Sequence, residues 1–187
     1  MRDTYSHLAA GTLLIAMPLL GDTRFRRSVV LICAHSDHGT TGVIVNRTLH
    51  SGIRDALPGA VRAALPDGAP LRDGGPAQPG RLFVLHGPDW RDDGRTVDVS
   101  GDFALTTGKR ALKARRDEGR PSRVLVARGY AAWGAGQLAE EMHANAWLTA
   151  PADPDLVFDA PDDEKWARAI GSLGVDASIL SPQHGHA

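Results

Sequence analysis

The sequence predicts a single α+β domain, and three observations support this class. Its 187 residues suit one domain with a real hydrophobic core. Short runs rich in branched apolar residues, bounded by Gly, Pro, Asp or Asn, are typical of strands. Helical segments fall between these runs at irregular intervals, without the steady alternation of a doubly wound α/β fold. We therefore expect residues 1–187 to form one domain.

Three early runs are predicted as strands with both faces buried. They are residues 12–17 (TLLIAM), 28–34 (SVVLICA) and 42–46 (GVIVN). None shows the apolar–polar alternation of a half-exposed strand, which indicates burial on both sides. Because only a short polar segment separates the second run from the third, we expect these two to form a hairpin.

The middle of the chain is predicted to contain two helices, a loop and two strands. Apolar residues recur at helical spacing in residues 53–65, which one proline would kink or break, and in residues 105–118. Residues 66–80 are rich in Gly, Pro and Asp, which predicts a loop. Residues 82–86 and 96–99 have the composition of strands.

The last third of the chain is predicted to contain three short strands and two helices. The strands are residues 124–127, 147–149 and 155–158, and the first helix is residues 137–145. The final helix has the clearest signals, with Asp159 as the expected cap and carboxylates in the first turn. Its apolar residues recur at helical spacing up to the glycine that ends it.

A glycine- and aromatic-rich motif, GYAAWGAGQL, begins at Gly129 and leads into the short helix. This motif resembles that of the YqgE/AlgH family of small bacterial proteins. Other segments match that family in the same order along nearly the whole chain: residues 11–18, Phe25 with 28–35, 39–47, 74–76, 85–86 and 145–147, Phe158, Trp166 and 185–187. The resemblance implies a strongly bent, mixed or antiparallel sheet that forms a partial barrel with flanking helices. It implies no reaction, because the family has no established one, and a transcriptional-regulator label is attached to part of it.

Composition and charge argue against several classes of protein. Lys plus Arg number 21 and Asp plus Glu number 22, a net charge of −1, so no overall charge favours nucleic acid or an anionic membrane. No apolar run reaches the ~18–20 residues of a membrane span, and residues 8–20 are interrupted by Pro18 and lack a signal-peptide cleavage site. The single cysteine rules out an internal disulfide and fits a cytoplasmic protein.

A binding site is the leading functional hypothesis. Gly134 and Gly136 precede a helix and offer backbone N–H groups to an anion. Residues from other segments could line a pocket beside them, which gives the candidate ligand-binding set Asn46, Arg47, Gly75, His86, Tyr130, Trp133, Gly136 and Gln137. The partner would be a small anionic ligand or a protein. In the structural alternative, the glycines pack under Trp133, Gln137 caps locally, and the tryptophans fill the core.

Cys33 is the candidate redox residue. On a strand, Cys33, His35 and Asp37 share one face, so a thiol relay is one hypothesis, with Cys33 partly exposed and oxidisable. Side chains two residues apart on a strand lie about 6–7 Å apart, too far for an easy hydrogen bond. The alternative is a buried structural thiol. No histidine or cysteine has zinc-finger or HExxH spacing, so we expect no metal and no cofactor.

A basic segment at residues 109–123 is the candidate nucleic-acid site. Its cations outnumber its carboxylates, and the candidate contacts are Lys109, Arg110, Lys113 and Arg116. No known DNA-binding motif accompanies the segment. The alternative is a solvated face, or one that pairs with the acidic residues between 153 and 164.

From these observations we predict a cytoplasmic, non-catalytic binding or regulatory protein with no catalytic residue. Two alternatives remain open. One is a cysteine-dependent redox-sensing or hydrolytic enzyme, and the other is direct DNA binding through residues 109–123. The sequence identifies neither the ligand nor the partner.

Overall fold

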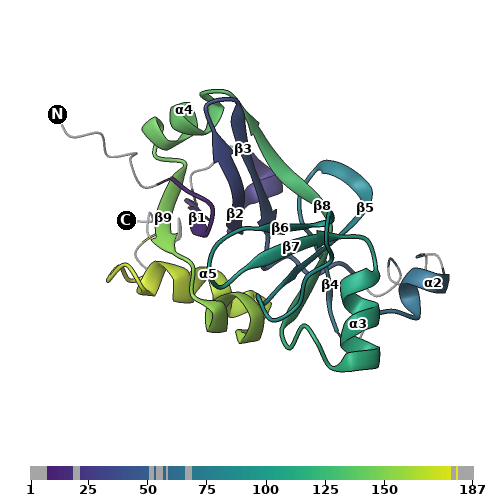
Figure 1. Cartoon of the computed structure of the whole chain (residues 1–187). Helices are drawn as coiled ribbons and strands as arrows, with labels where there is room; N and C mark the ends of the chain where they lie inside the picture. The colour runs from purple at the N-terminus through teal and green to yellow at the C-terminus, as the bar shows by residue number, and fades with distance from the viewer. Residues whose placement is uncertain are drawn as a thin grey trace.

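The structure of the chain is a computed structural model that describes residues 8–18, 22–50, 53, 57, 59–65, 69–177 and 180. These residues form a strongly curled sheet with helices packed around it (Figure 1). The strands are β1 (Thr12–Ala16), β2 (Val29–Ser36), β3 (Gly39–Ile44), β4 (Leu71–Asp73), β5 (Ala77–His86), β6 (Thr96–Asp98), β7 (Ala104–Thr107), β8 (Val124–Gly134) and β9 (Trp147–Pro151). The helices are α2 (Gly59–Arg62), α3 (Arg110–Glu118), α4 (Gln137–His143) and α5 (Asp162–Gly171), with the helical turns η1 (Thr23–Phe25) and η2 (Asp155–Asp159).

The described strands form one sheet in the order β6-β7-β5-β8-β3-β2-β1-β9, and β4 pairs with β8 beside this path. The β4–β8 pair is parallel, and neighbours along the path are antiparallel. The sheet curls into a half-barrel, so the predicted α+β class and bent sheet are confirmed. The assignment of residues 1–187 to one domain stays a prediction, because both ends of the chain lie outside the described residues.

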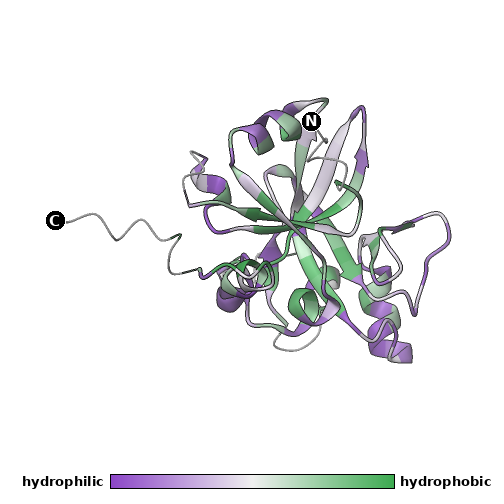
Figure 2. Cartoon of the chain, turned by 90° about the vertical axis from the view of Figure 1, so that its left-hand side faces the viewer, coloured by the Kyte–Doolittle hydropathy of each residue, from purple (hydrophilic) through white to green (hydrophobic). Residues whose placement is uncertain are grey.

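The strand β1, residues 29–33 of β2 and most of β3 are buried, as their composition predicts, whereas Ala34, His35 and Ser36 at the end of β2 are exposed. Leu13 and Ile15 of β1 belong to the main core, which also contains Trp166 of α5. Leu14 and Ala16 alternate with them and belong to a second cluster on the opposite face. Figure 2 shows hydrophobic residues concentrated along the strands where they converge. The predicted hairpin is confirmed, because β2 pairs with β3 in antiparallel register.

The long strand β8 bends where it passes from one half of the sheet to the other. Before the bend its residues pair with β4 and β5, and after the bend they pair with β3. Gly129 lies at the bend with φ 70°, and a Cβ there would lie 2.3 Å from the carbonyl oxygen of Gly75. A Cβ on Gly75 would lie 2.3 Å from the backbone of Tyr130. Only glycine fits this close backbone contact of Gly75 with Gly129, which we call the glycine crossing. The two glycines therefore permit the curvature of the sheet.

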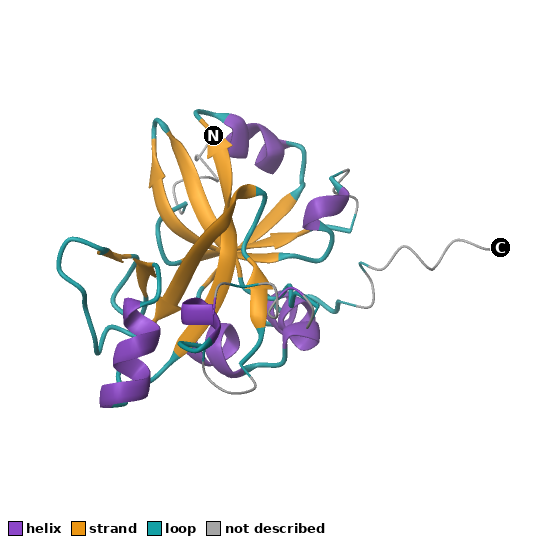
Figure 3. Cartoon of the chain, turned by 90° about the vertical axis from the view of Figure 1, so that its right-hand side faces the viewer, coloured by secondary structure: helices purple, strands orange, loops and turns teal. Residues whose placement is uncertain are grey.

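Helices pack against the sheet at separate places (Figure 3). Leu112 of α3 packs with Val84 of β5 and Val126 of β8. Leu138 of α4 joins the second cluster, and Trp166 of α5 joins the main core. Three different regions of the sheet are therefore covered by elements from different parts of the chain.

One predicted element is wrong and two are wrong in part, because α3 confirms residues 110–118 of the helix predicted at residues 105–118. Residues 104–107 form β7 rather than the start of a helix, because Thr106 and Thr107 favour a strand and Gly108, with φ 85°, breaks it. The predicted loop 66–80 contains β4, which gains its partner from β8. The predicted strand 155–158 is the helical turn η2.

The boundaries of three further elements differ from the prediction. The strand predicted at residues 124–127 continues to Gly134, because neighbouring strands pair with it on both sides of the bend. The N-terminal cap of α5 is Pro161 rather than Asp159, whose carboxylate pairs with Arg123 at 3.1 Å. Most of the first half of the helix predicted at residues 53–65 lies outside the described residues, and α2 is its described part.

Candidate functional site

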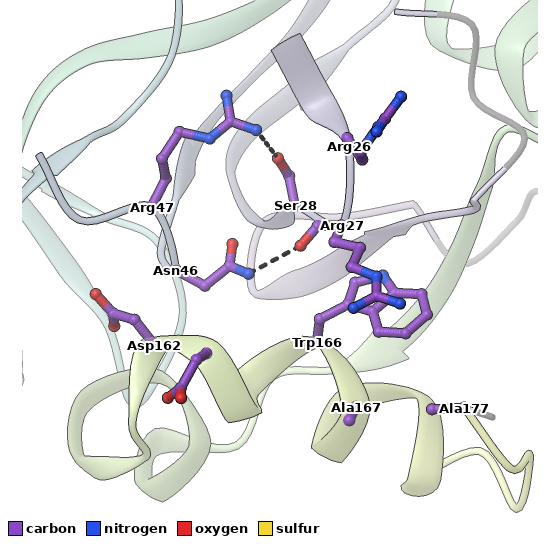
Figure 4. A pocket seen from close by; sticks show the side chains of 10 residues that line it. Arg26, Arg27, Ser28, Asn46, Arg47, Asp162, Trp166, Ala167 and Ala177 are labelled. Carbon is purple, nitrogen blue, oxygen red and sulfur yellow. Dashed lines mark hydrogen bonds between the residues drawn. The ribbon is translucent and has the colours of Figure 1, made fainter. Parts of the chain in front are cut away.

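A pocket of about 400 Å³ lies between the turn before β2, the segment after β3, and α5 (Figure 4). We call it the arginine pocket. Its lining residues are Arg26, Arg27, Ser28, Asn46, Arg47, Asp162, Asp163, Trp166, Ala167 and Ala177. The pocket therefore joins two segments near the N-terminus to a helix near the C-terminus.

Asn46 fixes the turn that carries two of the arginines. Its side-chain oxygen accepts a hydrogen bond from the backbone N–H of Val29 at 2.8 Å, and its Nδ2 donates to the carbonyl oxygen of Arg27 at 2.9 Å. Arg27 has φ 51°, a left-handed conformation that is unfavourable for a residue with a Cβ. The two hydrogen bonds of Asn46 support this conformation, so Arg26 and Arg27 are held beside the pocket (Figure 4).

The side chains of Arg47 and Arg27 are oriented by further contacts. Arg47 donates through Nη2 to the hydroxyl oxygen of Ser28 at 3.0 Å and through Nη1 to the carbonyl oxygen of Arg24. The guanidinium carbon of Arg27 lies 5.0 Å from the ring centroid of Trp166, a cation–π contact. The two groups that Arg47 contacts are neutral, so they position its guanidinium without forming an ion pair.

Asp162, in the wall of the pocket, is the centre of a buried ion network. Arg72 donates to its carboxylate through Nε at 3.0 Å and Nη2 at 2.9 Å. Nζ of Lys165 lies 2.9 Å from Oδ1, and the hydroxyl of Thr48 donates to Oδ2. Burial raises the pKa of Asp162, but the hydrogen bonds from Arg72 and Thr48 outweigh burial, and the pKa falls below its usual value. Asp162 is therefore an ionised anchor rather than a free acid.

Lys165 is fully buried and has three acceptors for its three N–H groups. Two of them are the carbonyl oxygens of Val45 at 2.9 Å and Val157 at 2.8 Å, and the third is Asp162. Burial lowers the pKa of Lys165, and repulsion from Arg72 adds to this effect. A buried ammonium is tolerated when all its donors are satisfied. The network thus fixes the start of α5 against β3 and β4, and it makes this wall of the pocket rigid.

Positive charge exceeds negative charge around the arginine pocket. Among the described residues of its lining and of the network behind it, the cations outnumber the carboxylates by three: Arg26, Arg27, Arg47, Arg72 and Lys165 against Asp162 and Asp163. Several guanidinium groups around one cavity are typical of sites for carboxylates and phosphates. The pocket can therefore bind an anion.

Comparison with known proteins identifies the family. The sequence profile described as AlgH-like matches residues 13–178. The chain belongs to the AlgH-like family. A UPF0301 protein of Ruegeria pomeroyi is 44% identical over 183 residues, covering 95% of this chain and 98% of that protein. A UPF0301 protein of Rhizobium rhizogenes is 40% identical over 189 residues, covering 96% of this chain and 94% of that protein.

Two solved structures share the AlgH-like fold. The solution structure of the AlgH protein from Pseudomonas aeruginosa matches with a TM-score of 0.73 and 36% identity, covering 100% of both chains. The crystal structure of protein DIP2367 from Corynebacterium diphtheriae matches with a TM-score of 0.71 and 26% identity, covering 88% of this chain and 87% of that chain. These matches confirm the predicted family and the half-barrel fold.

The AlgH-like fold divides the candidate ligand-binding set among separate places. Asn46 and Arg47 line the arginine pocket, whereas Gly75 lies at the glycine crossing. Tyr130 lines a second pocket on other strands. The expected single surface around Gly129 is therefore not formed by this set. Anion binding by Asn46 and Arg47 stays a prediction.

Three more members of the set, Trp133, Gly136 and Gln137, lie in or beside a closed network that we call the aromatic corner (Trp133, Gln137, Glu141 and Trp147). Glu141 accepts hydrogen bonds from the indole N–H of Trp133 at 2.9 Å and of Trp147 at 2.8 Å. Gln137 donates to the other oxygen of Glu141 at 3.0 Å and accepts from the backbone N–H of Gly134 at 3.0 Å. The structural alternative is confirmed for Gln137 and the tryptophans, because Gln137 caps locally and the indoles are buried.

His86, the last member of the set, is a buried core residue. Its Nδ1 lies 2.7 Å from the carbonyl oxygen of Gly87, and its Nε2 lies 2.9 Å from the hydroxyl oxygen of Thr106. A carbonyl oxygen only accepts, so Nδ1 carries the proton and Nε2 accepts from Thr106. Burial lowers the pKa of His86, and both ring nitrogens are engaged. The side chain is also 0% exposed. His86 therefore offers no free group to a ligand.

Cys33 is buried, contrary to the expectation of partial exposure. Its side chain is 5% exposed, and burial raises its pKa to about 12, so the reactive thiolate is scarce at neutral pH. A bulge between Ile32 and Ala34 interrupts the alternation that would align Cys33 with His35. His35 instead lies 2.7 Å from the hydroxyl of Thr40. The geometry fits a structural thiol, and redox chemistry stays a prediction.

The basic segment at residues 109–123 is partly neutralised by carboxylates. Of the four candidate contacts, the two arginines form ion pairs, Arg110 with Asp92 at 2.8 Å and Arg116 with Asp117 at 2.9 Å. Arg123 pairs with two carboxylates of the acidic segment at 2.8 and 3.1 Å. The two candidate lysines, Lys109 and Lys113, are exposed. DNA binding stays a prediction, with fewer unpaired cations than the sequence suggests.

Within the part of the chain that the structure describes, no three His, Cys, Asp or Glu side chains are grouped so that they could hold a metal ion. Likewise, no helix in that part is long and apolar enough to cross a membrane. The histidines at positions 184 and 186 lie outside the described residues.

Neither the ion network of Asp162 nor the role of Glu141 in the aromatic corner is predicted from the sequence. One local signal for the network exists, because Lys165 lies on the buried side of α5 next to Trp166, and Asp162 precedes it by one helical turn. A lysine in an apolar stripe indicates a buried charge that needs a partner. Arg72 is 90 positions from Asp162 and gives no such signal.

Proposed function

We propose that this AlgH-like protein is a non-catalytic binding protein that holds a small anion in the arginine pocket. One observation carries the proposal: Arg26, Arg27 and Arg47, from two segments of the chain, line one cavity of about 400 Å³. That volume lies in the range of small-molecule sites. Asn46 and the network of Asp162 support its walls, so binding would require little ordering of the site.

The groups around the pocket favour binding over catalysis. Asp162, one of the two carboxylates that line the pocket, already receives donors from Arg72, Thr48 and Lys165. All three donors of Lys165 are engaged as well. A protein of this kind would act through ligand-dependent contact with a partner, which is the sense in which we propose a regulatory role. We expect that role in the cytoplasm, where a lone cysteine stays reduced.

Calorimetric titration and thermal shift with inorganic phosphate, pyrophosphate and citrate test the proposal. We expect at least one of these anions to bind and raise the Tm, and its affinity to fall as salt is added. Arg26→Gln should weaken that binding about tenfold or more, because a hydrogen bond to a charged group contributes about 1.5–3 kcal/mol. Arg26 is exposed, so the variant should fold normally.

Arg95→Gln is the matched control, because it removes an exposed arginine that does not line the pocket. Its affinity for the anion should equal that of the wild type. An equal loss in both variants would mean nonspecific attraction to positive charge. Absence of binding by all three probes at millimolar concentration would also contradict the proposal.

A further inference from the structure

A second pocket, of about 230 Å³, is lined by strands of the half-barrel. Its lining comes from five neighbouring strands, β7, β5, β8, β3 and β2, and it borders the main core cluster. It shares no lining residue with the arginine pocket. We call this cavity the strand pocket.

The walls of the strand pocket are largely apolar. Val43 and Phe83 are buried beneath it, and the half-buried Leu105 and Tyr130 also line it. The rings of Phe83 and Tyr130 pack edge to face with their centroids 5.5 Å apart. An apolar ligand body would remove water from this surface, which is favourable.

Among the described residues that line this pocket, Arg81 is the one cation, and none is a carboxylate. Its guanidinium carbon lies 5.7 Å from the ring centroid of Phe83. Its Nη1 donates to the side-chain oxygen of Gln78 at 3.2 Å, a neutral acceptor. A guanidinium has five N–H donors, and no carboxylate among the described residues pairs with this one, so it places a positive charge next to an apolar wall.

The backbone that carries Arg81 is irregular. The register of β5 against β8 shifts between Ala77 and Leu82, so the residues between them leave the regular ladder. Within this bulge Gln78 has φ 47°, a left-handed conformation that is unfavourable for a residue with a Cβ. Bulges and strained residues concentrate beside binding sites, where they redirect side chains. Here the bulge carries both Gln78 and Arg81 in the lining of the strand pocket.

We propose that the strand pocket binds a small monocarboxylate with an aromatic or branched aliphatic body. The body would contact Phe83, Leu105 and Tyr130, and the carboxylate would pair with Arg81. One cation matches one negative charge, and a volume of about 230 Å³ is smaller than the sites of drug-sized ligands. This site is independent of the anion site in the arginine pocket.

Calorimetric titration and amide NMR spectra of the whole chain with benzoate test this proposal, with benzamide as its neutral counterpart. We expect benzoate to bind and to shift the amide signals of Phe83 and Tyr130. Benzamide should bind about tenfold more weakly or not at all, and Arg81→Gln should weaken benzoate by a similar factor, because the ion-paired hydrogen bond is lost. Leu105→Phe should weaken benzoate too, because it fills the cavity.

Arg26→Gln is the control that separates the two pockets, and it should leave benzoate binding unchanged. The proposal is overturned if Arg81→Gln binds benzoate as tightly as the wild type, or if benzamide binds equally well. It is also overturned if benzoate shifts residues 26–28 instead of Phe83 and Tyr130, or fails to bind at millimolar concentration. None of these outcomes depends on whether phosphate, pyrophosphate or citrate binds in the arginine pocket.

Discussion

The aromatic corner and the arginine pocket use polar side chains in opposite ways. In the corner, Glu141 accepts from two indoles and Gln137, so its polar groups satisfy one another. In the pocket, Asn46 and Asp162 hold the walls while three arginines line an open cavity. The motif that stands out most in the sequence therefore builds the architecture, and residues that do not stand out line the cavity.

The largest loss of stability should come from a substitution at the glycine crossing, on the same strand as Trp133 of the aromatic corner. Gly129→Val places a branched side chain at φ 70° and 2.3 Å from a carbonyl oxygen. We expect a loss of more than about 5 kcal/mol and no stable fold, measured by urea denaturation and circular dichroism. Gly171→Ala is the control, since a Cβ there meets nothing within 4 Å, and it should be neutral or stabilising. A folded Gly129→Val protein would show that the crossing does not require glycine.

The next largest effect should come from the wall of the arginine pocket. Asp162→Ala leaves the buried Lys165 and Arg72 without their carboxylate, so we expect a loss of about 3–5 kcal/mol in the free energy of unfolding. The neighbouring Asp163 is exposed, and Asp163→Ala should change stability by less than about 0.5 kcal/mol. Equal effects in the two variants would contradict a rigid wall and weaken the contrast with the corner.

A smaller effect should come from the carboxylate of the corner. Glu141→Ala leaves the buried indole N–H groups of Trp133 and Trp147 without an acceptor, which should cost about 2 kcal/mol. Thermal unfolding and the red shift of tryptophan fluorescence measure the change. Glu140→Ala, one position earlier on an exposed site, is the control and should leave both signals unchanged. If Glu141→Ala instead abolished anion binding with stability intact, the corner would be a site after all.

The smallest effect on stability should be a pH dependence from His86. Like the polar groups of the aromatic corner, its ring nitrogens are hydrogen-bonded within the protein. Burial lowers its pKa in the folded state below the ordinary value of 6.5, so the unfolded chain binds the proton more readily. Its contribution to stability is therefore complete above about pH 6.5 and is lost as the pH falls toward the lower folded pKa. Urea denaturation between about pH 7 and pH 5 should show a smaller decline in His86→Gln than in the wild type. Equal declines would mean that His86 is accessible to protons in the fold.

The strands near the N-terminus could be predicted because their own residues decide the outcome. In β1, Leu13 and Ile15 face one cluster while Leu14 and Ala16 face another, and an apolar run without alternation requires such burial. The final helix was predictable for the same reason, from its apolar stripe. By contrast, β4 is a strand only because β8 pairs with it, and its three residues carry no sufficient signal of their own.

The candidate site could be predicted only in part. The sequence predicts Asn46 and Arg47 as ligand-binding candidates, and both line the arginine pocket. The other wall of that pocket is α5, and its position against the sheet depends on contacts between distant residues, such as Arg72 with Asp162. His86 and Trp133 are of residue types that also suit a ligand site. Only the structure shows that both are buried and that their polar atoms are hydrogen-bonded within the protein. Residue type therefore identified candidates, and tertiary contacts decided between them.

The ion network has a consequence for the order in which the protein is made. Arg72 leaves the ribosome 90 positions before Asp162, and β1 likewise waits for β9 on its outer edge. Until α5 emerges, Arg72 lacks its carboxylate, and the pocket lacks one wall. The wall that α5 supplies to the arginine pocket is therefore added only after most of the half-barrel has been translated.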